Sequence, residues 1–140
     1  MPDVIYNSFK KDIMNGSIDL GADTIKVMLV DSSYVPDQDL HTVKSDVTGE
    51  VTGAGYTAGG AALANKTVTQ DNVDNEGVFD ADDVTWANST ITARGAVLYK
   101  DTGAPSTSPL ICYMDFGADK TSSGGDFTIQ WNAEGIVNLT

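Results

Sequence analysis

Short apolar segments separated by turns fill most of the chain after Val51, and their spacing limits the fold more than any other feature. The segments are rich in β-branched and aromatic residues and recur at intervals of roughly 8–15 residues. They are residues 66–70, 77–80, 84–86, 91–99, 110–116, 127–131 and 136–139. Together with residues 24–30 they predict a mainly β fold, an antiparallel β-sandwich with a jelly-roll-like core.

One amphipathic helix is expected at the start of the chain. Ile5, Phe9 and Ile13 recur at i, i+4 and i+8, which predicts a helix over about residues 4–15 that ends at Gly16. A helix this short is marginal alone, so its apolar face must pack on something. A second short helix is predicted within residues 37–47, with Asp37 or Asp39 as its cap.

Length and charge limit the classes of function. A chain of 140 residues is expected to form a single domain over residues 1–140. The 20 acidic and 8 basic residues give a formal net charge of −12. A field of this sign repels phosphate backbones and predicts no nucleic-acid partner. It would suit docking onto a basic surface.

The expected location in the cell rests on two kinds of segment that are not found in the sequence, a membrane-spanning run and a secretion signal. No apolar run approaches the ~20 residues that span a membrane, so we expect no membrane partner. The first residues do not resemble a secretion signal, which predicts a protein that is made and kept in the cytoplasm, or released by lysis. The single cysteine, Cys112, excludes an internal disulfide and is expected to be a buried small hydrophobe.

The stretch GAGYTAGGAALANKT, residues 53–67, superficially resembles a nucleotide-binding loop. A dinucleotide turn needs a strand before it and a helix after it, and here a strand follows instead. Asn65 also replaces the glycine that lets a phosphate loop approach its ligand. We therefore expect these glycines to form a tight turn in which only small residues fit.

The other candidates for chemistry are weak, and no catalytic, cofactor-binding or metal-binding residue is predicted. A catalytic triad could use His41, but the sequence contains no nucleophile elbow, G-x-S-x-G, with which it could act. The acidic residues between Asp71 and Asp83 do not follow a calcium-loop pattern and are expected to be solvated turns, with an incidental calcium site as the alternative. Asp82, Asp83 and Glu134 lie near tryptophans, as in glycosidases, but nothing fixes the carboxylate separation.

Several segments resemble small virion-structure proteins of tailed bacteriophages. They are residues 18–30, 55–60 (GYTAGG), 79–86 (FDADDVTW), 93–99 (ARGAVLY), 109–117 (PLICYMDFG) and 127–131 (FTIQW). The resemblance covers about residues 5–139. It implies a non-enzymatic capsid decoration, or cement, protein that is usually trimeric and has a β-sandwich core.

From this resemblance we expect a homotrimer on the outer surface of the phage head, bound to the major capsid protein and made in the host cytoplasm. The candidate partner contacts are the helix face and two loops: Ile5, Phe9, Ile13, Tyr34, Val35 and Tyr56. The helix could instead cap the chain's own core. A tail, baseplate or fibre protein that contacts a receptor is the first alternative, and a small non-virion enzyme or binding module is the second.

Overall fold

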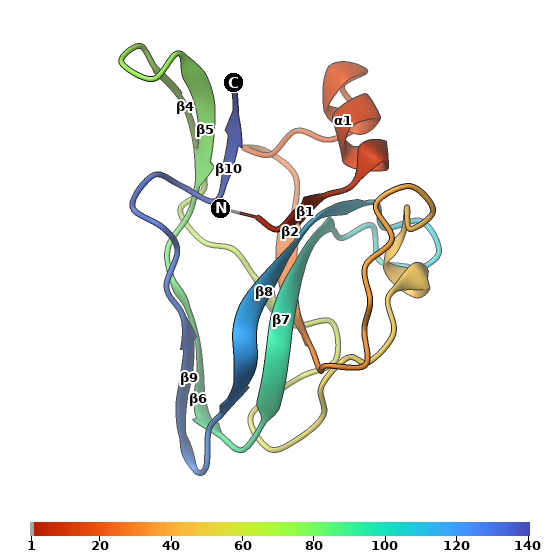
Figure 1. Cartoon of the computed structure of the whole chain (residues 1–140), viewed down its shortest axis with the longest axis vertical. Helices are drawn as coiled ribbons and strands as arrows, with labels where there is room; N and C mark the ends of the chain where they lie inside the picture. Colours follow the sequence, from red (N-terminus) through yellow and green to blue (C-terminus); the bar gives the residue numbers. More distant parts are fainter. Residues whose placement is uncertain (1) are drawn as a thin grey trace.

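Antiparallel strands are the main secondary structure of the protein, seen here in a computed structural model that describes residues 2–140 (Figure 1). The largest sheet has the order β1-β8-β7-β2-β3. Its strands are β1 (Val4–Ile5), β8 (Leu110–Thr121), β7 (Thr92–Lys100), β2 (Ile25–Val30) and β3 (Ala61–Ala62). Every pairing in this sheet is antiparallel, which confirms the predicted mainly β, antiparallel class.

Two smaller sheets follow one another along the other side of the molecule (Figure 1). One has the order β10-β5-β4, from β10 (Val137–Leu139), β5 (Glu76–Asp80) and β4 (Thr67–Asp71). The other pairs β6 (Val84–Ser89) with β9 (Gly125–Ile129). Because β6 follows β5 after three residues, and β9 and β10 pair with these two strands, the small sheets are successive parts of one antiparallel ribbon.

The main sheet is buried on both faces. One face packs Leu29 and Leu98 into a cluster with Phe79, Trp86 and Phe127 of the smaller sheets. The opposite face packs other residues of β2, β7 and β8 against Tyr6 and a loop. These residues are Met28, Val30, Val97, Tyr99, Leu110 and Tyr113. Burial on both faces explains why β2 and β7 are nearly continuous apolar runs rather than alternating ones.

Helix α1 (Asn7–Met14) is shorter than predicted, because the chain before it is extended. Val4 and Ile5 pair with Tyr113 and Cys112 of β8, so the predicted start near residue 4 is wrong. These hydrogen bonds cover the edge of β8, which would otherwise expose unpaired backbone groups. The predicted stop is confirmed, since the helix ends before Gly16, whose φ is +77°.

The predicted second helix within residues 37–47 is also wrong. The Asp37 carboxylate accepts hydrogen bonds from the backbone N–H groups of Asp39 and Leu40, which closes a single turn. The chain then leaves helical geometry because Leu110 N–H donates to the carbonyl of Thr42. Only a 3₁₀ turn, η1 (Lys44–Asp46), follows.

Candidate functional site

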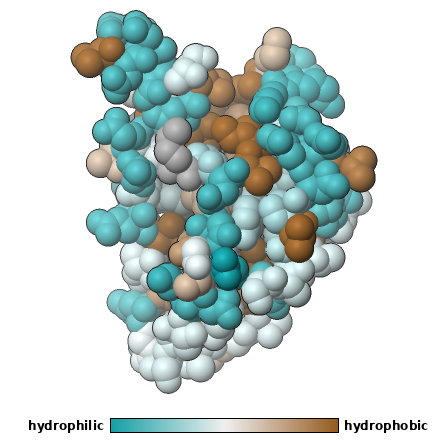
Figure 2. All heavy atoms as spheres, in the orientation of Figure 1, coloured by the Kyte–Doolittle hydropathy of each residue, from teal (hydrophilic) through white to brown (hydrophobic). Residues whose placement is uncertain are grey.

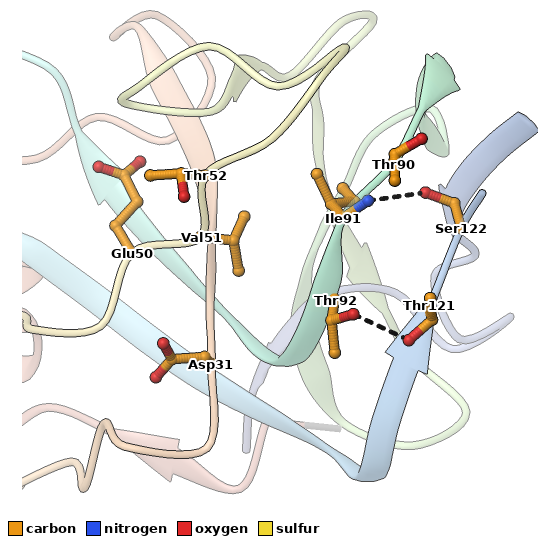
Figure 3. Close-up of a pocket in the computed structure, with 9 residues that line it drawn as sticks. All are labelled: Asp31, Glu50, Val51, Thr52, Thr90, Ile91, Thr92, Thr121 and Ser122. Atoms are coloured by element: carbon orange, nitrogen blue, oxygen red, sulfur yellow. Dashed lines mark hydrogen bonds between the residues drawn. The ribbon is translucent and has the colours of Figure 1, made fainter. Parts of the chain in front are cut away.

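A hydroxyl-rich recess lies between the end of β2 and the paired ends of β7 and β8, where Thr92 faces Thr121 (Figure 3). Its volume is about 380 Å³, and its polar lining consists of carboxylates and hydroxyls. These are Asp31, Glu50, Thr52, Thr90, Thr92, Thr121 and Ser122. The carboxylates of Asp31 and Glu50 lie on one side and the hydroxyls of β7 and β8 on the other (Figure 3).

Most of these polar groups already bond to the chain itself. The hydroxyls of Thr92 and Thr121 lie 2.9 Å apart, and Ser122 Oγ bonds to the buried hydroxyl of Ser89 at 2.7 Å. Glu50 Oε2 accepts hydrogen bonds from Tyr56 Oη and from the backbone N–H of Gly59, each at 2.7 Å. Hydroxyl and carboxylate oxygens have more than one lone pair, so the recess can still accept hydrogen bonds from water or a polyol. Its lining contains neither histidine, lysine nor cysteine.

The glycine-rich loop packs tightly, which confirms its predicted role. Gly60 has a φ of +81°, and a Cβ built there would lie 1.8 Å from the carbonyl oxygen of Val27. At Gly55 the same atom would lie 2.8 Å from the Cα of Ser89. Tyr56 Oη accepts a hydrogen bond from Leu29 N–H at 3.0 Å while donating to Glu50, so the loop is fastened to β2.

The predicted contact residues of the helix face pack mainly inside the protein. Phe9 is fully buried in the main cluster, and Ile5 and Ile13 are half-buried against it. The apolar stripe of α1 therefore covers the chain's own core, the second role considered for it. Tyr56, predicted as a loop contact, is likewise half-buried against that cluster.

Residues 31–41 form a loop, here called the display loop, that contains the two remaining predicted residues. Tyr34 points inward and is buried, whereas the side chain of Val35 is 76% exposed. Leu40, which was not among the predicted contact residues, is equally exposed. Asp37 and Asp39 lie between these two apolar side chains in the sequence.

The display loop is anchored by buried hydrogen bonds. Tyr34 Oη bonds to Tyr6 Oη at 2.7 Å and to His41 Nδ1 at 2.9 Å. The His41 ring stacks on the Tyr34 ring, and its Nδ1 also accepts the N–H of Asp37 at 3.1 Å. A nitrogen that accepts from a backbone N–H carries no proton, so it accepts from Tyr34 as well. His41 thus holds a loop in place.

The start of α1 fastens the same loop from its other side. Asn7 N–H donates to the carbonyl of Gln38 at 3.1 Å, and Asn7 Nδ2 donates to Asp39 at 2.7 Å. Gln38 Nε2 in turn donates to the carbonyl of Ile5 at 2.7 Å. The Asp39 and Leu40 N–H groups on the Asp37 carboxylate hold its pKa below its usual range. The loop therefore presents Val35 and Leu40 from a fixed backbone.

Three other residues considered from the sequence, Cys112, Asp82 and Asp83, are buried or hydrogen-bonded within the chain. Cys112 is fully buried, as predicted, and burial raises the pKa of its thiol to about 12. The Asp83 carboxylate accepts the backbone N–H of Trp131 at 3.0 Å, and the Asp82 carboxylate accepts from the side chain of Asn65. Two of the three acids considered for glycoside cleavage therefore join neighbouring segments of the chain.

An acidic group lies at the tip of the β4–β5 hairpin. Carboxylate oxygens of Asp71, Asp74 and Glu76 all lie within 4.8 Å of one another. The Asp71 carboxylate also accepts the N–H groups of Val73 and Asp74, as in an ordinary Asx turn. The three carboxylates concentrate negative charge at this end of the molecule.

An apolar groove that the sequence analysis did not predict separates this hairpin from the end of α1. Its volume is about 270 Å³. The groove is lined by Ile13, Leu20, Val68, Phe79, Val137 and Leu139. In Figure 2, hydrophobic atoms gather between the arm formed by β4, β5 and β10 and the side that carries α1. The only signals in the sequence were the isolated apolar residues Val68 and Leu139 in polar surroundings.

Comparisons with known proteins add no relative from which a role could be transferred. No family model matches the chain, and no curated protein or solved structure matches it. Among residues 2–140, no helix has both the length and the apolar character needed to cross a membrane. The resemblance to phage virion proteins therefore stays a prediction.

Proposed function

We propose that this chain is a structural virion protein that decorates and stabilises the head of a tailed bacteriophage. In this proposal it binds the lattice of the major capsid protein from the outer surface, as a homotrimer. Its finer architecture is then a two-layer β-sandwich of jelly-roll type, with the main sheet in one layer and the β4–β5–β6–β9–β10 ribbon in the other.

The anchored display loop is the observation that carries this proposal. Val35 and Leu40 are each 76% exposed, yet their backbone is held by Tyr34, Asn7 and Gln38. A surface that is rigid before binding loses little conformational entropy when a partner docks. An apolar pair on a fixed loop is therefore suited to a structural contact. The net charge of −12 favours a basic region of the capsid surface.

The first test locates the protein on the particle. Immunogold labelling of phage particles from the source culture, with antibody against this chain, should place gold over the heads. Gold confined to tails would refute decoration and favour a tail, baseplate or fibre role. The hydroxyl-rich recess favours that second candidate, because hydroxyls and carboxylates are suited to hydrogen bonding with receptor glycans.

The second test isolates the display loop. Val35→Ser should weaken binding to heads that lack this protein, and Val35→Ser combined with Leu40→Ser should weaken it further. Val73→Ser is the matched control, because Val73 is 87% exposed on the distant β4–β5 hairpin. Equal binding by the Val35→Ser and Val73→Ser variants in co-sedimentation would remove the display loop from the proposal.

A further inference from the structure

We propose that the apolar groove is a docking site for a basic segment of another protein, one that carries aliphatic side chains between lysines or arginines. The groove lies apart from the display loop, so this inference goes beyond the proposed function and does not depend on it. Three features carry it: the free space at Gly77, the exposed apolar walls, and the charge around the groove.

The pairing of β4, β5 and β10 explains the space. Val68, Phe79 and Val137 lie in one row across the sheet, and Gln70, Gly77 and Leu139 form the next row on the same face, two residues along each strand. Side chains of the first row form an apolar wall. In the second row Gly77 has no side chain, and a Cβ built there would have no atom within 4 Å. The wall is therefore hollow at its centre.

The rim of the groove leaves apolar surface uncovered. Val68 is 59% exposed and Leu139 is 46% exposed. Within residues 2–140, β4 is also an edge strand, paired only with β5. An edge strand with free backbone groups beside an apolar hollow is suited to an extended peptide, which can hydrogen-bond along the strand and insert alternate side chains.

Charge selects which peptide fits. Asp19 lines the groove, and its carboxylate is held there by the N–H groups of Gly21 and Ala22. The carboxylates of Asp71, Asp74 and Glu76 stand at the hairpin tip next to Gly77. An apolar site flanked by carboxylates attracts a segment whose aliphatic side chains are accompanied by cations.

The nearby lysines do not cancel the negative charge around the groove. Lys66 donates to the carbonyl of Asp23, and Lys100 forms an ion pair with the Asp23 carboxylate at 3.0 Å. Lys11 of α1 lies 3.5 Å from the Asp12 carboxylate. A second copy of this chain is a poorer occupant of this groove than a basic segment, because a chain of net charge −12 supplies few of the cations that the carboxylates around the groove attract.

Gly77→Val tests the groove because it fills the hollow without straining the backbone. Gly77 does not have a positive φ, and the added side chain meets open space. Gly125→Val is the matched control. Gly125 also lies in a strand, also lacks a positive φ and also has no atom within 4 Å of a built Cβ, but it belongs to β9 at the other end of the molecule.

The probe is a synthetic capped peptide in which lysine alternates with leucine and valine, added to the ¹⁵N-labelled full chain and followed by NMR. We expect shifts of the amide signals of Val68, Gly77 and Leu139, and weaker binding at higher salt. Gly77→Val should weaken the affinity by at least about tenfold, whereas Gly125→Val should leave it unchanged. Replacing the lysines of the peptide by glutamates should abolish binding.

Three results would overturn the proposal. Equal affinity of the unchanged chain and Gly77→Val would remove the groove as the site. Equal binding of the lysine and glutamate peptides would refute the argument from charge. Self-association in sedimentation without peptide, lost in Gly77→Val, would make a second copy the occupant. Should Gly77→Val fail to fold, Val68→Ser on the exposed rim takes its place, with the same loss expected.

Discussion

The hydrogen-bonded chain from Tyr6 through Tyr34 to His41 predicts an asymmetry between two similar substitutions. Tyr6 is fully buried, and its hydroxyl bonds to Tyr34 Oη at 2.7 Å. Tyr34 Oη also bonds to His41 Nδ1 at 2.9 Å. Because Nδ1 accepts that bond, the Tyr34 oxygen accepts the proton of Tyr6. Removing the middle hydroxyl should therefore destabilise the fold more than removing the terminal one.

The magnitudes follow from which groups lose their partners. Tyr6→Phe removes one hydrogen bond and leaves Tyr34 bonded to His41, which should cost about 0.5–1.5 kcal/mol of unfolding free energy. Tyr34→Phe removes both bonds and leaves the buried Tyr6 hydroxyl without a partner, for a total of about 2–4 kcal/mol. In the double variant no buried hydroxyl remains, so its cost should fall about 1–3 kcal/mol short of the sum.

Urea unfolding, followed by the fluorescence of Trp86 and Trp131, measures the free energy of unfolding of the unchanged chain, the two single variants and the double variant. The dependence of free energy on urea should stay the same, so that the midpoints report stability alone. A Tyr6→Phe cost equal to or above that of Tyr34→Phe would refute the direction of the hydrogen bonds. Additive costs would refute their coupling.

Three further predictions concern packing and titration. Gly60→Ala should cost several kcal/mol because its Cβ would meet the Val27 carbonyl, whereas Gly103→Ala, with a φ of +93° but open space, should cost about 1–2 kcal/mol in urea unfolding. Burial raises the pKa of Tyr6, Tyr34 and Tyr99, so the unfolded chain ionises first. Their contribution to stability should be complete below pH ~10 and should fall above it by about 1.4 kcal/mol per pH unit for each tyrosine. Tyrosinate absorbance that rises near pH 10 without unfolding would contradict this. Cys112, whose pKa burial raises to about 12, should react with a thiol reagent only as fast as the protein opens; rapid labelling of the folded protein would contradict its burial.

The strands could be predicted because their signals are local. Residues 24–30 alternate little but are apolar and β-branched, and β2 occupies Ile25–Val30. The tight loop at residues 53–60 could be predicted for the same reason, since glycines at short spacing have few uses other than close turns. The length of β8 could not, because it continues to Thr121 through Gly117, which looked like the start of a loop.

The contacts of the candidate site could not be predicted because they depend on partners far along the chain. The stripe of Phe9 and Ile13 indicates that something covers it, but its period does not say whether the cover is this chain or another. Tyr34 and Val35 are adjacent residues in a loop, and contacts with distant residues such as Tyr6 and Tyr113 hold Tyr34 inward. The apolar groove depends on the row of Gly77 across three strands, which no single segment contains.

Helix α1 contacts both surfaces proposed for binding, the display loop and the apolar groove. Only variants that leave this helix intact can therefore test the two surfaces one at a time. Its first residue, Asn7, bonds to the display loop, while Ile13 in its last turn lines the apolar groove. Truncation of residues 1–14 would remove both supports together with the buried Tyr6 and Phe9, so a loss of binding would report only unfolding. Val35→Ser and Gly77→Val leave Tyr6 and Phe9 in place. Capsid binding that is lost in Val35→Ser and kept in Gly77→Val would therefore assign the head contact to the display loop and leave the groove for a different, basic partner.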